Sequence, residues 1–307
     1  MPPRSFLVAL LLAAPAIAPA QSLLPPAVLD TTKVYYSVSE ATAHAATAYR
    51  LNIRQQHYYS FPAEACGLVN VQFINAMMND IETLPPQIGQ LQHLQQINFR
   101  ENRLRALPTG FFQLENLQEV DFGHNQFTEL AAGYGRLRHL RVLQLGENLL
   151  RTLSPEIGSL KELYSLNLSY NQLETLPPQL GRLRRLRDLA LTQNHLRALP
   201  DELSGLPALQ NLALEYNQLT RLPAGLGRLG ELRSLLLAYN QLTALPESIT
   251  RLSQLELLDL GHNQLAALPP HLGRLTHLRT LILTGNPLSA SEKQRIRQEL
   301  PEATIIF

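Results

Sequence analysis

The chain has 307 residues, with 26 Lys and Arg residues against 25 Asp and Glu residues and a formal net charge of +1. This near-neutral balance gives no electrostatic basis for binding nucleic acid or an anionic membrane surface. The single cysteine, Cys66, excludes an internal disulfide framework and a cysteine-based zinc cluster.

Residues 1–20 have the features of a cleaved signal peptide. Arg4 supplies a positive charge, residues 6–14 form an apolar run, and Ala18-Pro19-Ala20 fits a small-x-small cleavage site. The alternative, a membrane anchor, needs about 20 apolar residues, and this run is shorter. We therefore expect a secreted or periplasmic protein with no membrane span in the mature chain.

The next two segments are expected to lead into the main part of the fold. Residues 21–33 are interpreted as a linker, because Pro25 and Pro26 should break any helix. Residues 34–48 are expected to form an N-terminal cap helix, with Ser37 or Ser39 as its N-cap. A cap is needed because the end unit of a repeat stack has no neighbour to bury its apolar edge.

Residues 49–288 contain about eleven repeats with a period of 23 residues. The consensus is L-x-x-L-x-x-L-x-L-x-x-N-x-L-x-x-L-P, and a fixed period of this length is typical of a solenoid. The last leucine-like position of successive repeats is held by Phe61, Leu84, Leu107, Leu130, Leu153, Leu176, Leu199, Leu222, Leu245 and Leu268.

Each repeat contains a strand signal and a turn signal. Leu166 and Leu168 alternate with polar residues, as in a short strand with one buried face. The stretch Leu84–Leu91, with its paired prolines and Gly89, predicts a turn with at most a short 3₁₀ or helical piece. Because strands would crowd on one side of the stack, that side should become concave.

One asparagine recurs in each repeat after the first, where Gln56 takes its place. We expect these amides to be buried and to bond backbone groups where each strand turns away. The row consists of Asn79, Asn102, Asn125, Asn148, Asn171, Asn194, Asn217, Asn240, Asn263 and Asn286.

Residues 289–307 are expected to form the C-terminal cap. Ser289 or Ser291 can serve as the N-cap of a helix that Pro301 stops, and residues 304–307 can form a last strand.

The 23-residue consensus with its L-P-x-x-[IL]-G-x-L motif resembles the leucine-rich-repeat superfamily. The similarity is greatest to the type found in Ras-pathway scaffolds, plant resistance proteins and bacterial secreted proteins. The resemblance implies a right-handed α/β horseshoe solenoid with a parallel concave sheet and a convex side of turns and 3₁₀ pieces. It also implies protein binding through the concave face. Local departures include Ser154 in place of the proline, Tyr134 at an inward position, and Cys66 where later repeats carry glycine.

Candidate contact residues are the concave strand positions that the framework leaves free. Tyr170, Tyr216 and Tyr239 share one position in their repeats, as a binding hot spot would; the alternative is that each ring covers its neighbour's edge. The full set is Tyr164, Tyr170, Gln193, Glu215, Tyr216, Leu236, Tyr239, Asp259 and His262. Secondary candidates nearer the N-terminus are Arg50, Arg54, Phe73, Met77, Arg100 and Asp121.

These features favour an exported, non-enzymatic protein-binding scaffold. The alternatives are a structural surface or adhesion component, or a targeting module or enzyme with an unrecognised site. No nucleophile elbow, P-loop or dinucleotide fingerprint is present in the sequence, and the histidines show no metal-ligand spacing. We expect a monomer with an unidentified protein partner, no cofactor and no metal. Arginines 136, 182, 228, 251 and 274 recur on the turn side and are interpreted as a solvated face.

Overall fold

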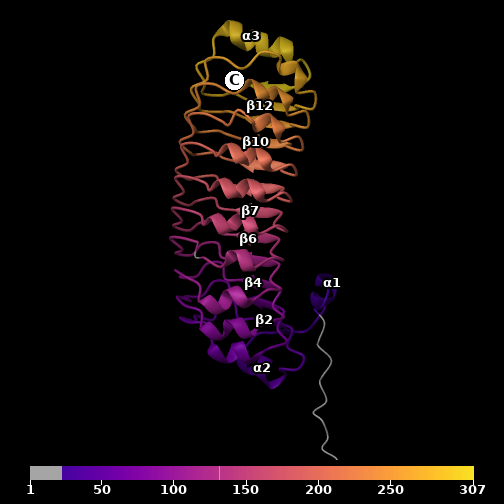
Figure 1. Ribbon diagram of the computed structural model, residues 1–307, viewed down its shortest axis with the longest axis vertical. Coiled ribbons are helices and arrows are strands. Elements are labelled where there is room, and N and C mark those ends of the chain that lie inside the picture. The colour runs from indigo at the N-terminus through magenta and orange to yellow at the C-terminus, as the bar shows by residue number, and fades with distance from the viewer. Residues whose placement is uncertain (1–22, 131) are drawn as a thin grey trace, which may run out of the picture.

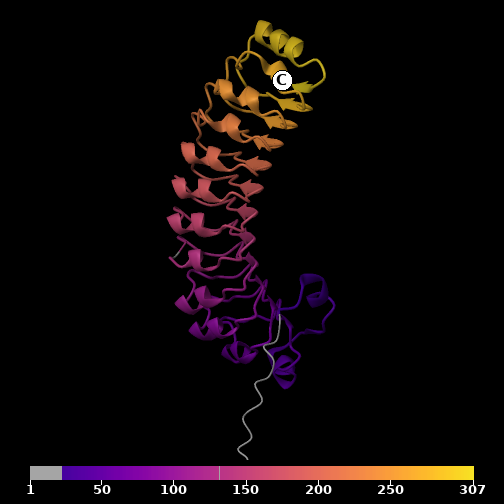
Figure 2. The ribbon, with the colours of Figure 1, turned by 45° about the vertical axis from the view of Figure 1, so that its right-hand side comes forward.

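The computed structural model describes residues 23–130 and 132–307, so the predicted signal peptide lies outside the described residues. The chain forms a long curved stack, with helices α1 and α2 at one end and α3 at the other (Figure 1). Thirteen strands form one sheet in the order of the sequence, and each strand pairs in parallel with the next. Figure 2 shows the strands on the inner side of the curve and the short helices on the outer side. The predicted solenoid with a concave parallel sheet is confirmed.

The described elements are short and regular. The strands are β1 (Val34–Tyr35), β2 (Arg50–Asn52), β3 (Phe73–Asn75), β4 (Gln96–Asn98), β5 (Glu119–Asp121), β6 (Val142–Gln144), β7 (Ser165–Asn167), β8 (Asp188–Ala190), β9 (Asn211–Ala213), β10 (Ser234–Leu236), β11 (Leu257–Asp259), β12 (Thr280–Ile282) and β13 (Thr304–Ile306). The α-helices are α1 (Pro26–Leu29), α2 (Val38–Ala43) and α3 (Ala290–Glu299). The 3₁₀ helices are η1 (Ala63–Gly67), η2 (Pro86–Gln90), η3 (Thr109–Gln113), η4 (Tyr134–Arg136), η5 (Pro155–Ser159), η6 (Pro178–Arg182), η7 (Asp201–Gly205), η8 (Leu226–Arg228), η9 (Glu247–Arg251) and η10 (Leu272–Arg274).

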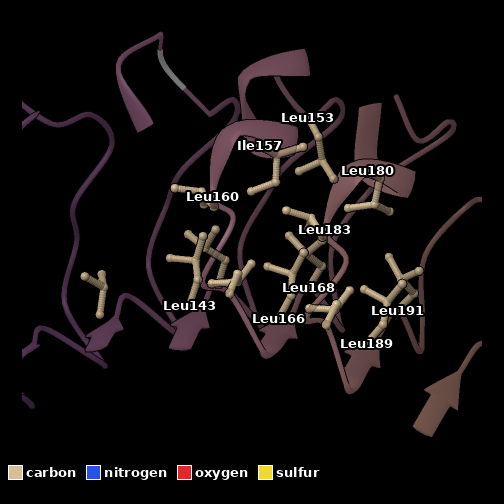
Figure 3. Packing of buried hydrophobic residues seen from close by; sticks show 14 of the residues in the cluster. Leu143, Leu153, Ile157, Leu160, Leu166, Leu168, Leu180, Leu183, Leu189 and Leu191 are labelled. Atoms are coloured by element: carbon tan, nitrogen blue, oxygen red, sulfur yellow. The ribbon is translucent and has the colours of Figure 1, made fainter. Parts of the chain in front are cut away.

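The repeated leucines form one continuous core between the sheet and the 3₁₀ helices. Leu166 and Leu168 of one repeat are buried, and so is Leu180 of the following 3₁₀ helix. Figure 3 shows these side chains stacked against their equivalents in the neighbouring repeats. Burying a leucine side chain contributes about 1.5–3 kcal/mol, so each repeat is stable chiefly because its neighbours cover it.

Aromatic residues replace several leucines in the early repeats. Phe122 packs against Phe99 and Phe111, with ring centroids 6.2 and 5.5 Å apart. Tyr134 is buried as expected and meets Phe112 edge-on at 5.3 Å. Gly133 has a φ of 120°, and a Cβ there would overlap the Phe112 ring. The glycine therefore makes room for this aromatic pair.

The asparagine row is buried as predicted. Nine of the ten side chains are buried, from Asn79 to Asn263, whereas Asn286 is half-buried. Asn171 illustrates the pattern: its Nδ2 donates to the carbonyl oxygens of Leu145 and Leu168, both at 3.0 Å. Its Oδ1 accepts the Leu150 N–H at 2.9 Å. Each amide thus connects the end of its own strand to the preceding repeat.

Both ends of the stack carry helices whose caps were among those expected. Ser37 Oγ accepts the Glu40 N–H at the start of α2, which ends at Ala43, short of the expected residue 48. Ser289 Oγ accepts the Glu292 N–H at the start of α3, and the last strand, β13, pairs with β12. Ser37 and Ser289 are therefore the N-caps, rather than Ser39 and Ser291.

The expectation that Pro25 and Pro26 break any helix was wrong. Helix α1 begins at Pro26, where proline is compatible with a helix because the first turn needs no N–H donor. Residues 23–33, called the N-terminal segment below, are also bound to the stack. The Leu24 N–H donates to Gln72 Oε1, and Gln95 Nε2 donates to the Leu24 carbonyl oxygen, both at 2.9 Å. Leu29 of α1 is buried.

Candidate functional site

Two columns of side chains border the concave sheet along the whole stack. The strand-start column consists of the residue directly before each strand, such as Tyr164 before β7. The strand-end column consists of the third residue after each strand, such as Tyr170 after β7. Between them, residues such as Ser165 and Asn167 face the concave surface, while Leu166 points into the core. The columns are parallel because every strand has the same register with its neighbours.

The strand-end column has a left-handed backbone throughout β2 to β12. Tyr170, Tyr216 and Tyr239 have φ values of 58°, 54° and 57°, and the other members have the same sign. The remaining members are Gln55, Met78, Glu101, His124, Glu147, Gln193, His262 and Gly285. Positive φ is uncommon for residues other than glycine. Here the positive φ turns the chain away from the sheet, so that the side chain of the next residue, the asparagine of the row described above, enters the interior. Sequence reasoning missed this feature, although the column contains no β-branched residue.

Three aromatic rings at the C-terminal part of this column stack face to face. The Tyr216 and Tyr239 centroids lie 4.2 Å apart at 8°, and Tyr239 and His262 lie 4.2 Å apart at 13°. The row ends at Gly285, where a Cβ would come within 2.6 Å of His262 Nδ1. The structure therefore brings three predicted residues into direct contact.

The stacked rings cover one another and also remain partly exposed. Their faces cover one another, yet Tyr216 and Tyr239 remain 47% and 42% exposed, so their edges and hydroxyls meet solvent. Desolvation and a side-chain hydrogen bond with Tyr239 raise the pKa of Tyr216. Tyr170 is also exposed but lies two repeats away, with Gln193 between.

A shallow hollow of about 290 Å³ lies on the sheet over β6 to β10. Its floor is made of small side chains, including Ser165, Ala190 and Ala213, and the candidate Leu236 lies at its edge.

Two further candidates near this hollow accept hydrogen bonds from neighbouring residues. Glu215 accepts the Thr192 hydroxyl at 2.7 Å, and Asp259 accepts the Gly261 N–H at 2.9 Å. Together with the aromatic stack, this region forms a concave surface that is mainly apolar.

The secondary candidates Arg100 and Asp121 belong to a charged cluster further toward the N-terminus. Arg100 donates to Glu147 Oε1 at 2.7 Å, and His124 Nδ1 lies 2.9 Å from Glu147 Oε2. The bonds from His124 and Arg100 lower the pKa of Glu147, whereas burial raises the pKa of Asp121. Gly123 leaves space for the Arg100 side chain, because a Cβ at this position would lie 3.1 Å from Arg100 Nη1.

The first repeats are partly occupied by the N-terminal segment. Arg50 Nη1 donates to the Asp30 carbonyl oxygen at 2.7 Å, and the Arg50 guanidinium lies 5.1 Å from the centre of the Phe73 ring. Arg54 Nη2 lies 3.3 Å from the sulfur of Met78, and Met77 is half-buried. Arg50 and Phe73 are therefore engaged by the chain itself.

Tyr164 lies apart from the other primary candidates. It belongs to the strand-start column, at the opposite end of β7 from Tyr170. It borders a separate depression of about 530 Å³, lined also by Arg141, Glu162, Arg184, Arg185, Arg187 and Ala208. This grouping could have been predicted from the sequence, since Arg141, Tyr164 and Arg187 occupy equivalent positions 23 residues apart.

Comparison with known proteins matches part of the chain to a repeat family. A family model described as leucine rich repeat matches residues 138–196, 161–219 and 230–288. These residues contain leucine-rich repeats. No curated protein sequence matches it.

Several solved structures resemble this leucine-rich-repeat protein. The ectodomain of the Arabidopsis thaliana receptor kinase GASSHO1/SCHENGEN3, in complex with CASPARIAN STRIP INTEGRITY FACTOR 2, is 30% identical with a TM-score of 0.66, over 76% of this chain and 29% of that one. The plant peptide hormone receptor RGFR1, in complex with RGF2, is 25% identical with a TM-score of 0.62, over 84% and 46%. An internalin from Listeria monocytogenes is 22% identical with a TM-score of 0.63, over 81% and 77%. The chain thus spans less than half the length of either plant receptor.

Residues 23–130 and 132–307 contain no group of three or more His, Cys, Asp or Glu side chains placed to hold a metal ion. Within the same residues, no helix is long and apolar enough to cross a membrane. Cys66 is buried, and its burial raises the pKa of the thiol to about 11.

Proposed function

We propose that this leucine-rich-repeat protein is an exported, non-enzymatic scaffold that binds a protein partner on its concave face. The observation that carries the proposal is the exposed stack of Tyr216, Tyr239 and His262 beside the hollow that Leu236 borders. Aromatic side chains next to a shallow apolar surface are typical of interface hot spots. In this arrangement the ring edges and the exposed hydroxyls contact the partner.

Two further observations support the proposal. Residues 1–20 match the pattern of a signal peptide, which agrees with export to the periplasm or the extracellular space. The two plant receptors of the same fold are each described in complex with a partner. We propose that the chain acts as a monomer, because its repeats are already covered at both ends by α2 and by α3 with β13.

The test is capture of partners from the native envelope or extracellular fraction on the purified mature protein. The bait is compared with a Tyr216→Ala/Tyr239→Ala variant and with a Tyr36→Ala/Tyr59→Ala control. The control removes two exposed tyrosines elsewhere in the chain. We expect the first variant to lose a specific partner and the control to keep it.

Thermal unfolding separates binding from packing. The variant loses two exposed ring stacks, so its unfolding midpoint should fall by only a few degrees. Capture that is unchanged in the Tyr216→Ala/Tyr239→Ala variant would contradict the proposal. A loss of cooperative unfolding would show that the rings act mainly as packing.

A further inference from the structure

The strand-start column leads from a bound polypeptide segment to the depression around Tyr164. At its N-terminal end, Gln72 and Gln95 bind both backbone groups of Leu24. The bonded row continues, because Gln118 Nε2 donates to Gln95 Oε1 at 2.6 Å and Arg141 Nη1 donates to Gln118 Oε1 at 3.0 Å. Arg141 is also one of the residues that line the depression. The column therefore already binds main-chain groups, those of Leu24, in this molecule.

The depression carries positive charge that the protein does not neutralise. Arg141 is balanced, since it lies 3.4 Å from Glu162. Arg184, Arg185 and Arg187 are exposed, and within residues 23–130 and 132–307 none of the three forms an ion pair. Three unpaired guanidinium groups line one hollow of about 530 Å³, and guanidinium groups bind carboxylates and other anions well.

We propose that this depression binds a carboxylate-rich segment of the protein partner, with the Tyr164 ring as an apolar platform. The inference rests on the proposed function and gives the partner a chemical property. Tyr164 is 40% exposed and can pack against the aliphatic part of an acidic side chain. Carboxylates can then accept paired hydrogen bonds from the guanidinium groups.

The charge distribution favours a peptide over a nucleic acid. Nucleic acid requires a basic stripe that follows successive phosphates. Here the unpaired arginines form one local cluster, with Glu162 on its wall and Asp188 directly after Arg187. The chain as a whole has a net charge of only +1.

The experiment measures binding of fluorescein-labelled hexaglutamate by anisotropy, at low salt, to the full mature protein. Hexaglutamine serves as the uncharged probe. We expect hexaglutamate to bind, hexaglutamine not to bind, and added salt to weaken the complex. Arg185→Glu/Arg187→Glu should weaken hexaglutamate binding by at least about tenfold, and Tyr164→Ala should weaken it several-fold.

The matched control is Arg251→Glu/Arg274→Glu, which changes the net charge equally on the convex side. Both arginines end 3₁₀ helices and are exposed. We expect this control to bind within about twofold of the unmodified protein. Should Arg185→Glu/Arg187→Glu fold poorly by circular dichroism, Arg185→Gln/Arg187→Gln provides the same comparison.

Three results would overturn the inference. These are equal weakening by both charge reversals, equal binding of hexaglutamine, and tighter binding of a single-stranded DNA hexamer than of hexaglutamate. The Tyr216→Ala/Tyr239→Ala variant should retain hexaglutamate binding. If this variant loses partner capture but still binds hexaglutamate, the two proposals have been tested separately.

Discussion

Substitution of Asn171 by alanine tests whether the buried amides hold the repeats together. Asn171 is only 6% exposed and sits in the middle of the stack. It supplies the partner of the Leu150 N–H at 2.9 Å, and it donates to the Leu145 and Leu168 carbonyl oxygens at 3.0 Å. Alanine can make none of these bonds.

The expected cost follows from which groups keep another partner. The Leu145 carbonyl is still bonded by Asn148, and the Leu168 carbonyl is still bonded by Asn194. The Leu150 N–H loses its bond to Asn171 and is left buried. An orphaned buried N–H costs about 1–3 kcal/mol and each lost bond about 0.5–1.5 kcal/mol. We therefore expect the free energy of unfolding to fall by about 2–6 kcal/mol.

The assay is urea unfolding followed by circular dichroism, with Asn167→Ala as the matched control. Asn167 lies in the same repeat but is half-buried, and its Oδ1 accepts only the local Ser169 N–H at 3.0 Å. The control should lose less than about 1 kcal/mol. If the two variants are equally stable, or if Asn171→Ala changes the unfolding free energy by less than about 0.5 kcal/mol, the amide row does not carry the role assigned to it.

Three further predictions concern other parts of the stack. Gly181→Ala should destabilise the protein, because a Cβ would overlap the Glu202 carbonyl oxygen, whereas Gly67→Ala has open space and should be neutral or slightly stabilising; chemical denaturation compares them. Cys66, with a thiol pKa raised to about 11 by burial, should resist alkylation at pH 8 in the folded protein and react in urea; reaction at the same rate in both states would contradict its burial. Gln72→Ala should speed hydrogen exchange at the Leu24 amide, while Gln118→Ala, which does not contact Leu24, should not.

The features that could be predicted from the sequence are those that recur in every repeat or depend on neighbouring residues. The core positions of Leu166 and Leu168 follow from the apolar pair at the same two places of every period, and the buried role of Asn171 follows from a similar repetition. The caps at Ser37 and Ser289 follow from local helix signals.

The features that were missed depend on contacts between distant residues or on backbone geometry. The binding of Leu24 by Gln72 and Gln95 joins positions up to 71 residues apart, and residues 21–33 carry no periodic pattern that reveals it. Tyr164 was grouped with Tyr170 because both flank one strand, yet they lie at opposite ends of β7. The stacking of Tyr216 on Tyr239 could be anticipated only as a shared column, because ring orientation depends on the left-handed backbone beneath it.

The left-handed column has a consequence for how this protein could acquire new specificity. Its backbone is fixed by the sheet bonds and by the amide that follows, so the strain is the same whichever unbranched side chain is present. Met78, Glu101, Gln193 and Tyr216 already occupy equivalent places without altering the fold. The side chains on this column can therefore be changed one repeat at a time, provided that valine, isoleucine, threonine and proline, which positive φ disfavours, are avoided. The molecule separates the residues that vary from those that hold it together.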